Sequence, residues 1–177
     1  MKNYTIEEHT HRFAVWTSAR AASKSRLKNS EVQNLMESIK LRQRVEMLRN
    51  EPLLNDEYYH NWIFELGTKL VIDAKLIAET DFKRDQFTFG VAAKIISIYI
   101  KTAEVLPTCG KSNLSAIAYP PIDGILIRNF NAANNMSLRT AWSKFEWEDY
   151  KQVILAIRDR YPGVPMWQVE SLWAIGF

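Results

Sequence analysis

A lysine and an aspartate, each beside the start of a predicted helix, are the residues of this chain best suited to chemistry. Lys94 ends the segment 89–94, Phe-Gly-Val-Ala-Ala-Lys, and Asp123 ends the segment 121–123, Pro-Ile-Asp. An apolar stretch follows each segment. A lysine amine can act as a nucleophile, and a nearby carboxylate can accept its proton or stabilise a developing positive charge. If the fold brings the two side chains together, they could break an N-glycosidic bond.

Two physical effects would favour Lys94 as a nucleophile. An apolar helix is predicted from about residue 91 to 105, which places Lys94 in the first turn, near the positive end of the helix dipole. Apolar neighbours would also remove part of the water around the amine. Both effects disfavour the protonated amine and leave more of the neutral, nucleophilic form. Asp123, at the start of the next predicted helix, is expected to stay ionised.

The backbone amides at the start of the helix predicted over residues 91–105 suggest that this segment could also bind an anion. The amides of Gly90, Val91 and Ala92 would point outward there and could bind a phosphate. A purely structural interpretation also exists, because lysines that extend toward solvent and aspartates that open helices are both common. On spacing alone, this structural interpretation is the stronger of the two.

Other patterns that could do chemistry are weaker. Residues 110–112, Gly-Lys-Ser, end like a phosphate-binding loop, but Val105 stands where that loop needs a glycine. His9 and His11 would point to different faces of a helix and do not form a zinc-binding pair. Cys109 is the single cysteine, which excludes an internal disulfide or a cysteine cluster. The sequence predicts no metal site and no cofactor.

Composition indicates one globular domain over residues 1–177. The chain is 47% hydrophobic and 24% charged, which is near average for a globular protein, and its length is sufficient for a hydrophobic core. The longest apolar run, residues 95–100, is too short to cross a bilayer. Residues 1–8 lack the apolar core of a signal peptide. We therefore expect a cytoplasmic protein without a membrane partner, and the sequence leaves its oligomeric state open.

Helical periodicity runs through almost the whole chain and predicts a compact all-α fold. Capping sequences begin three of the predicted helices, at Thr5, Ser30 and Ser143. Pro121 suits the first position of another helix, and Pro, Gly, Ser and Asn residues mark 107–120 as a loop. The predicted helices cover residues 5–20, 30–50, 55–77 and 91–105, a segment from Pro121 onward, residues 143–160 and a short segment near 167–173.

The charge of the chain is distributed unevenly. Residues 11–49 contain nine basic and three acidic side chains, whereas the whole chain has a formal net charge of +3. Such a basic half suits a polyanionic partner, because binding to phosphates releases counterions. Two amphipathic helices with solvated basic faces would give the same composition, so both interpretations stay open.

The segments that end in Lys94 and Asp123 also match the motifs of a known family. Residues 87–130 resemble the helix-hairpin-helix DNA glycosylase superfamily, particularly its 8-oxoguanine DNA glycosylase branch. That superfamily has Leu-Pro-Gly-Val-Gly-x-Lys at its hairpin, then Pro-Val-Asp, with an arginine five residues after the aspartate. Here residues 90–94 match the hairpin from its first glycine, residues 121–123 match the second motif, and Arg128 lies at the arginine position. Thr88 and Phe89 replace Leu-Pro, and Ala92 replaces the second glycine of the hairpin.

The resemblance implies a function as well as a fold. It implies a helix-hairpin-helix element near residues 76–105 and a site in which Lys94 forms a Schiff base with the substrate and Asp123 is the catalytic carboxylate. It also implies DNA contacts from Gly90, Val91, Ala92 and Arg128. The expected partner is double-stranded DNA with a damaged base, and the expected activity is removal of a modified purine, with lyase cleavage of the strand as a possible second step.

Two other functions fit the same sequence. The chain could keep the hairpin fold and bind nucleic acid without catalysis. It could instead be a helical interaction protein whose basic half binds an acidic partner and whose Trp147, Trp167 and Trp173 form an interface. The distance between the Lys94 amine and the Asp123 carboxylate is the structural observation that bears most directly on the enzymatic prediction.

Overall fold

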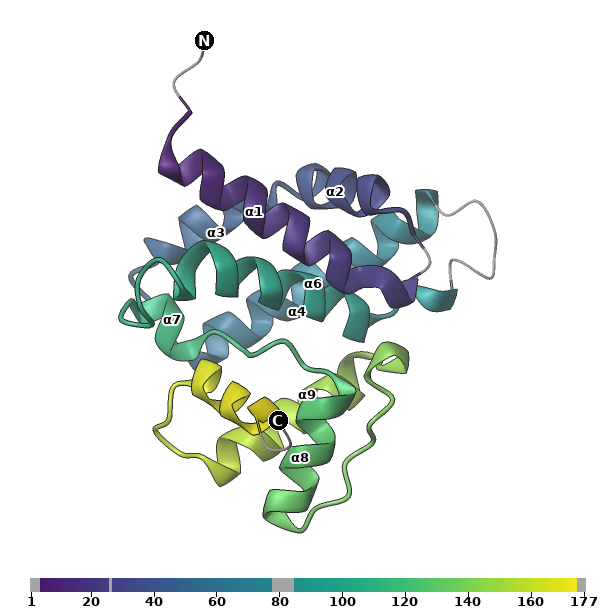
Figure 1. Cartoon of the computed structure of the whole chain (residues 1–177), viewed down its shortest axis with the longest axis vertical. Helices are drawn as coiled ribbons and strands as arrows, with labels where there is room; N and C mark the ends of the chain where they lie inside the picture. Colours follow the sequence, from purple (N-terminus) through teal and green to yellow (C-terminus); the bar gives the residue numbers. More distant parts are fainter. Residues whose placement is uncertain (1–3, 26, 78–84, 175–177) are drawn as a thin grey trace.

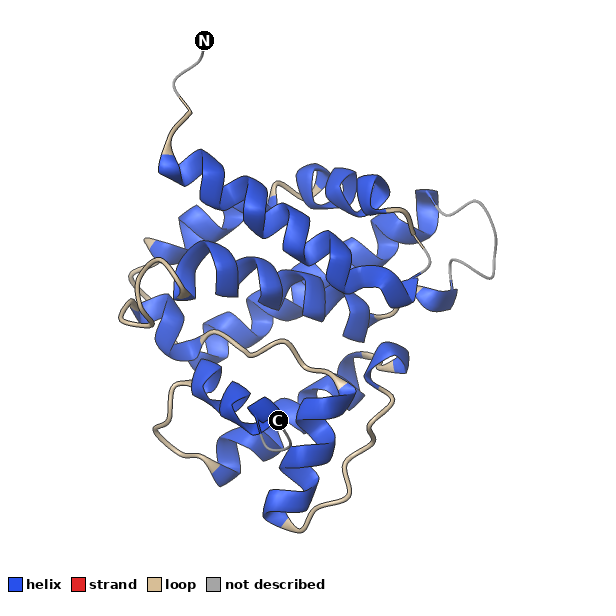
Figure 2. Cartoon of the chain, in the orientation of Figure 1, coloured by secondary structure: helices blue, strands red, loops and turns tan. Residues whose placement is uncertain are grey.

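The computed structural model describes residues 4–25, 27–77 and 85–174, and every regular element within these ranges is a helix (Figures 1 and 2). The predicted all-α fold is therefore confirmed. In the same ranges, no helix combines the length and the apolar character needed to cross a bilayer.

The amino-terminal half forms a bundle around one central helix. Helix α6 is buried on almost all sides because its residues are apolar around the whole helix, with Lys94 as the exception. Helix α1 packs against one side of α6, and α4 packs against another. The helices of this half are α1 (Ile6–Ala21), α2 (Asn29–Ser38), α3 (Leu41–Arg49), α4 (Asp56–Ile77) and α6 (Phe89–Ile100).

The carboxy-terminal half covers another side of the bundle, as the lower part of Figure 1 shows. Helix α6 continues into a π-helical turn, and a long extended segment then leads to α8. The elements of this half are the π turn η2 (Lys101–Val105), α7 (Asn113–Ile117), α8 (Gly124–Asn134), the 3₁₀ turn η3 (Trp142–Lys144), α9 (Trp147–Arg160) and the 3₁₀ helix η4 (Met166–Ala174).

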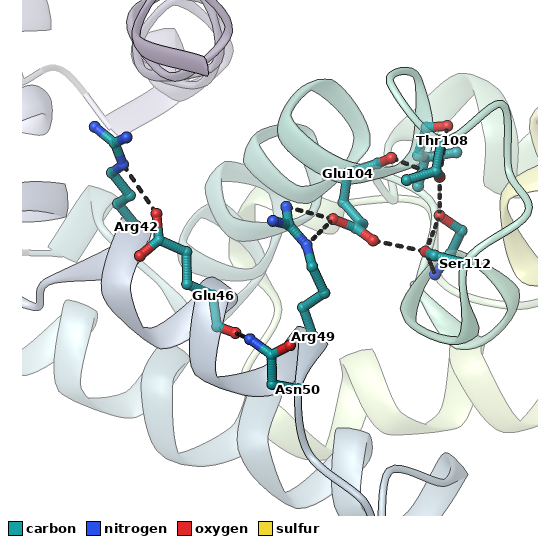
Figure 3. A network of polar contacts seen from close by, with 9 residues as sticks. Arg42, Glu46, Arg49, Asn50, Glu104, Thr108 and Ser112 are labelled. Atoms are coloured by element: carbon teal, nitrogen blue, oxygen red, sulfur yellow. Dashed lines mark hydrogen bonds and ion pairs between the residues drawn. The ribbon is translucent and has the colours of Figure 1, made fainter.

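A buried ion pair fixes the π turn to helix α3 (Figure 3). The Glu104 side chain is fully buried, and its Oε2 lies 2.6 Å from the Arg49 guanidinium. The Ser112 hydroxyl donates a 2.6 Å hydrogen bond to the other carboxylate oxygen. A buried carboxylate needs such partners, because desolvation of an unpaired charge is costly. Three segments are thereby held together at the end of α6.

Four predicted helix starts are wrong by a few residues. Helix α2 begins at Asn29, with Lys28 rather than Ser30 as its N-cap, and the helix predicted over residues 30–50 is two helices, α2 and α3, separated by Ile39 and Lys40. Helix α6 begins at Phe89, with Thr88 as its N-cap, so Lys94 lies in the second turn rather than the first. Helix α8 begins at Gly124, and Pro121 belongs to the extended segment before it. Helix α9 begins at Trp147 rather than Ser143, because Glu146 and Asp149 supply the capping interactions.

The predicted hairpin element near residues 76–105 is described only in part. Helix α4 ends at Ile77, and residues 78–84 lie outside the described ranges. The second half of the element is the start of α6, where the Thr88 hydroxyl accepts a hydrogen bond from the Val91 amide at 3.4 Å.

Candidate functional site

Lys94 and Asp123 lie in direct contact, as the enzymatic prediction requires. The Lys94 Nζ is 3.3 Å from the Asp123 Oδ2. The side chains are 15% and 19% exposed, respectively, so both are largely buried and both still reach solvent. The contact joins the second turn of α6 to the start of α8 and connects the two halves of the fold.

Asp123 is fixed by the helix that it caps. Its Oδ1 accepts hydrogen bonds from the amides of Ile125 and Leu126, both at 3.0 Å. An aspartate is a favoured N-cap because these helix amides otherwise lack partners. One carboxylate oxygen therefore binds the helix start, and the other faces the Lys94 amine. The hydrogen bonds to Oδ1 therefore also fix the position of Oδ2.

An aromatic ring covers the amine of Lys94. The Nζ lies 4.3 Å from the centre of the Trp142 ring, in a cation–π arrangement. The carboxylate and the ring both stabilise a positive charge on the amine, whereas burial opposes it. The Lys94 amine thus has an acceptor for its proton, the Asp123 carboxylate, at 3.3 Å.

The segment that carries Trp142 packs directly on the start of α6, and Gly90 is the residue that permits this. A β-carbon at position 90 would lie 2.0 Å from the Trp142 carbonyl oxygen. The Gly90 amide donates to the Phe145 carbonyl at 3.0 Å, and the Thr88 hydroxyl donates to the Ser143 carbonyl at 3.2 Å. Gly90 therefore serves close backbone packing, which places Trp142 over the amine.

This packing bears on the three amides predicted to bind phosphate. Gly90, Val91 and Ala92 are all buried. The Gly90 amide binds Phe145, and the amides of Val91 and Ala92 bind Thr88, through its hydroxyl at 3.4 Å and its carbonyl at 3.1 Å. In this conformation the three amides satisfy intramolecular acceptors and do not face a ligand.

Arg128 is exposed and lies one helical turn after the start of α8. Its guanidinium folds back over Gly124, since a β-carbon at position 124 would lie 3.2 Å from one of its nitrogens. The structure thus places Arg128 close to the residue that follows Asp123. Of the predicted DNA contacts, Arg128 is the one whose polar group reaches solvent near the lysine–aspartate pair.

A second lysine–carboxylate–tryptophan unit lies where α6 passes into the π turn η2, and it was not predicted from the sequence. Lys101 follows Lys94 by two helical turns, forms an ion pair with Glu170 and lies 4.9 Å from the centre of the Trp173 ring. Residues two turns apart share a helix face, and Glu170 and Trp173 are spaced by one turn of η4. This spacing was the signal that could have identified the unit.

The two units influence each other electrostatically. Burial raises the pKa of Glu170, and the ion pair with Lys101 acts in the opposite direction. Asp123 makes a smaller contribution to this rise through charge repulsion between the two carboxylates. The site is therefore a row of two cations and two carboxylates between α6 and the carboxy-terminal half.

A groove of about 660 Å³ opens beside the second unit. Lys101 and Glu170 line one part of it, and Leu106, Cys109 and Trp167 line another. The indole nitrogens of Trp167 and Trp173 are buried without a hydrogen-bond acceptor among the described residues. The groove thus combines apolar walls with one cation and one carboxylate.

The histidines act in structural contacts. His11 shares a 2.8 Å hydrogen bond with the Tyr99 hydroxyl, and His9 shares one of 3.0 Å with Tyr4. Within the described ranges, no group of three or more His, Cys, Asp or Glu side chains is arranged to hold a metal ion.

Comparison of the chain with protein-family models, curated proteins and solved structures gives no match. The functional interpretation consequently depends on the geometry of the site. Its central feature is the contact between the Lys94 amine and the Oδ2 of Asp123, whose Oδ1 is fixed by backbone amides.

Proposed function

We propose that this protein is a DNA N-glycosylase that removes a modified purine through a Schiff base on Lys94 and can then nick the strand. The observation that carries the proposal is the 3.3 Å contact between the Lys94 Nζ and the Asp123 Oδ2. Two residues chosen from sequence for this chemistry are thereby placed in a partly exposed position at the junction of α6 and α8.

Asp123 has two roles in the proposed reaction. It accepts a proton from the Lys94 ammonium, which leaves a neutral amine able to attack. It passes this proton to the departing base and, ionised again, stabilises the positive charge that develops on the sugar as the glycosidic bond lengthens. Because the amides of Ile125 and Leu126 hold its other oxygen, the carboxylate needs little reorganisation during either role.

The bond changes balance without a cofactor. The Lys94 nitrogen forms a bond to C1′ of the deoxyribose, and the C1′–N bond breaks with its electron pair leaving on the base, which takes up a proton. Opening of the sugar ring then gives the imine. Loss of a C2′ proton and departure of the 3′ phosphate complete the lyase step. Borohydride reduces the imine and makes the adduct permanent.

The groove beside Lys101 supports the proposal because it offers space for a flipped base. Its volume of about 660 Å³ exceeds that of a purine, and it adjoins the unit that interacts with Asp123. The Lys101 ammonium and the Glu170 carboxylate supply a donor and an acceptor for the edge of a base, and Trp167 supplies an aromatic wall. The hairpin amides are satisfied internally, so we assign the nearest phosphate contact to the exposed Arg128.

Borohydride trapping tests the proposal. The wild-type protein is incubated with labelled duplexes that contain 8-oxoguanine, another modified purine or an abasic site, and borohydride is added. We expect a covalent adduct with wild type and none with Lys94→Gln. Lys69→Gln is the matched control, because Lys69 forms a 3.0 Å ion pair with Asp73 on the surface of α4, at 47% exposure. Absence of an adduct across all duplexes would refute the Schiff-base mechanism.

A non-catalytic nucleic-acid-binding domain is the second candidate. The observation that favours it is that Asp123 and Trp142 both contact the Lys94 amine and would stabilise a positive charge on it, as in an ion pair that only supports the fold. This candidate predicts salt-dependent binding to duplex DNA without an adduct or strand cleavage. An interaction protein with an acidic partner, in contrast, predicts negligible affinity for DNA.

A further inference from the structure

The outer face of α1 carries two large aromatic side chains in solvent. Phe13 is 50% exposed and Trp16 is 48% exposed. Their rings stack on each other, with centroids 5.8 Å apart and an angle of 21° between the planes. Exposed aromatic pairs of this kind are typical of binding surfaces, because water solvates the flat ring faces poorly.

Positive charges extend this aromatic pair along the helix. The Arg20 guanidinium lies 5.0 Å from the centre of the Trp16 ring, and Lys24 follows one turn later in an exposed position. Among the described residues, neither has a carboxylate at ion-pair distance, whereas Arg12 pairs with Glu8 at 2.7 Å. Residues 9–30 contain five basic side chains and no acidic one. We refer to Phe13, Trp16, Arg20 and Lys24 as the α1 strip.

The α1 strip is separate from the lysine–aspartate site. Helix α1 packs on α6 through His11, which shares a 2.8 Å hydrogen bond with Tyr99, and on the π turn η2 through Thr17, whose hydroxyl is 3.4 Å from that of Thr102. Lys94 uses another face of α6 and reaches toward α8. In Figure 1, α1 lies along the upper edge of the molecule and α8 lies in the lower half. A ligand on the α1 strip would therefore not occupy the proposed active site.

We propose that the α1 strip binds single-stranded nucleic acid. Successive bases can stack on the rings of Phe13 and Trp16, and Arg20 and Lys24 can neutralise the adjoining phosphates. An acidic peptide would match the charge but would leave the two ring faces without a planar partner. An anionic membrane would need a continuous apolar surface, whereas Ile6, the other large exposed apolar residue of α1, lies two helical turns before Phe13.

Fluorescence anisotropy with labelled oligothymidylate of about 12 nucleotides tests the proposal. We expect affinity to fall with rising salt, by roughly 0.7 in the logarithmic slope for each phosphate contact. Trp16→Ala and Phe13→Ala should each weaken binding by about five-fold or more, as loss of a stacked base predicts. Arg20→Gln should also reduce the salt slope. Ile72→Ala is the control, because Ile72 is 54% exposed on α4, away from the strip.

Several outcomes would overturn the proposal. Equal affinity for oligothymidylate in wild type, Trp16→Ala and Phe13→Ala would exclude stacking on these rings, provided that circular dichroism shows folded proteins. Binding to vesicles of anionic phospholipid, with no binding to the oligonucleotide, would assign the strip to a membrane surface. Lys94→Gln should bind oligothymidylate like wild type, so the result is independent of whether the proposed glycosylase activity is found.

Discussion

The two lysine units, on α6 and on the π turn that continues it, have the same components but hold their carboxylates in different ways. Lys94 and Lys101 share a helix face, and each has a carboxylate and a tryptophan ring beside its amine. Asp123 is fixed by two backbone amides at the start of α8. Glu170 is held by its ion pair with Lys101 in a buried position that raises its pKa.

This difference suggests a division of labour. A carboxylate fixed by backbone amides keeps its position, which suits proton transfer and stabilisation of a cation. A carboxylate held mainly by one side chain, on the wall of a groove, can exchange that partner for a ligand. We therefore assign chemistry to the Lys94 unit and base recognition to the Lys101 unit, in line with the proposed glycosylase function.

The largest expected effect is a contrast between Lys94→Gln and Lys101→Gln. With a duplex that contains an abasic site, Lys94→Gln should form no borohydride adduct, because the attacking amine is gone. Lys101→Gln should keep adduct formation within a few-fold of wild type, since no base has to be recognised. With a duplex that contains the damaged base, both variants should lose excision. Gel analysis of the two duplexes measures both effects.

Equal behaviour of the two lysine variants would break the proposed division. If Lys101→Gln also abolishes the adduct at an abasic site while it remains folded, Lys101 acts in the chemistry and not only in recognition. If Lys101→Gln excises the damaged base like wild type, the groove does not bind the base.

The next effect concerns Asp123. Asp123→Asn should lower the single-turnover rate by about 10²–10⁴-fold, because proton acceptance is lost. Asparagine remains a good N-cap, so the stability of the fold should change little. Asp123→Ala removes the cap as well and should cost about 1 kcal/mol of stability in a denaturant titration. A rate in Asp123→Asn close to that of wild type would show that the carboxylate only anchors the lysine.

The sequence predicted the lysine–aspartate pair but not what surrounds it. Lys94 and Asp123 stood out because their residue types and local motifs have chemical meaning, and helical periodicity gave the fold class. Trp142 lies in a segment without periodicity, and its position depends on long-range packing against Gly90. Glu170 belongs to a 3₁₀ helix, and no sequence motif connects it with Lys101. Such residues depend on tertiary contacts that local patterns do not encode.

A smaller effect tests the origin of the Trp142 contact. Gly90→Ala places a β-carbon 2.0 Å from the Trp142 carbonyl oxygen, so the backbone must move, at a cost of about 1–3 kcal/mol. Gly124→Ala is the control, because the nearest atom there belongs to the flexible Arg128 side chain at 3.2 Å. Thermal unfolding compares the two variants. Equal stability would show that residues 142–145 can shift away from α6 at little cost.

The smallest effect is the pH dependence contributed by Glu170. Because its folded pKa is raised above the ordinary value of 4.5, the folded state binds a proton more readily than the unfolded state. The resulting stabilisation is present at low pH and is lost as pH rises from about 4.5 through the raised pKa. Subtracting the unfolding free energy of Glu170→Gln from that of wild type should therefore give a difference that declines over this window. A difference that does not change with pH would mean that the ion pair with Lys101 fully offsets the effect of burial on the pKa of Glu170. Glu170 and Asp123 would then differ only in the contacts that hold their carboxylates in place.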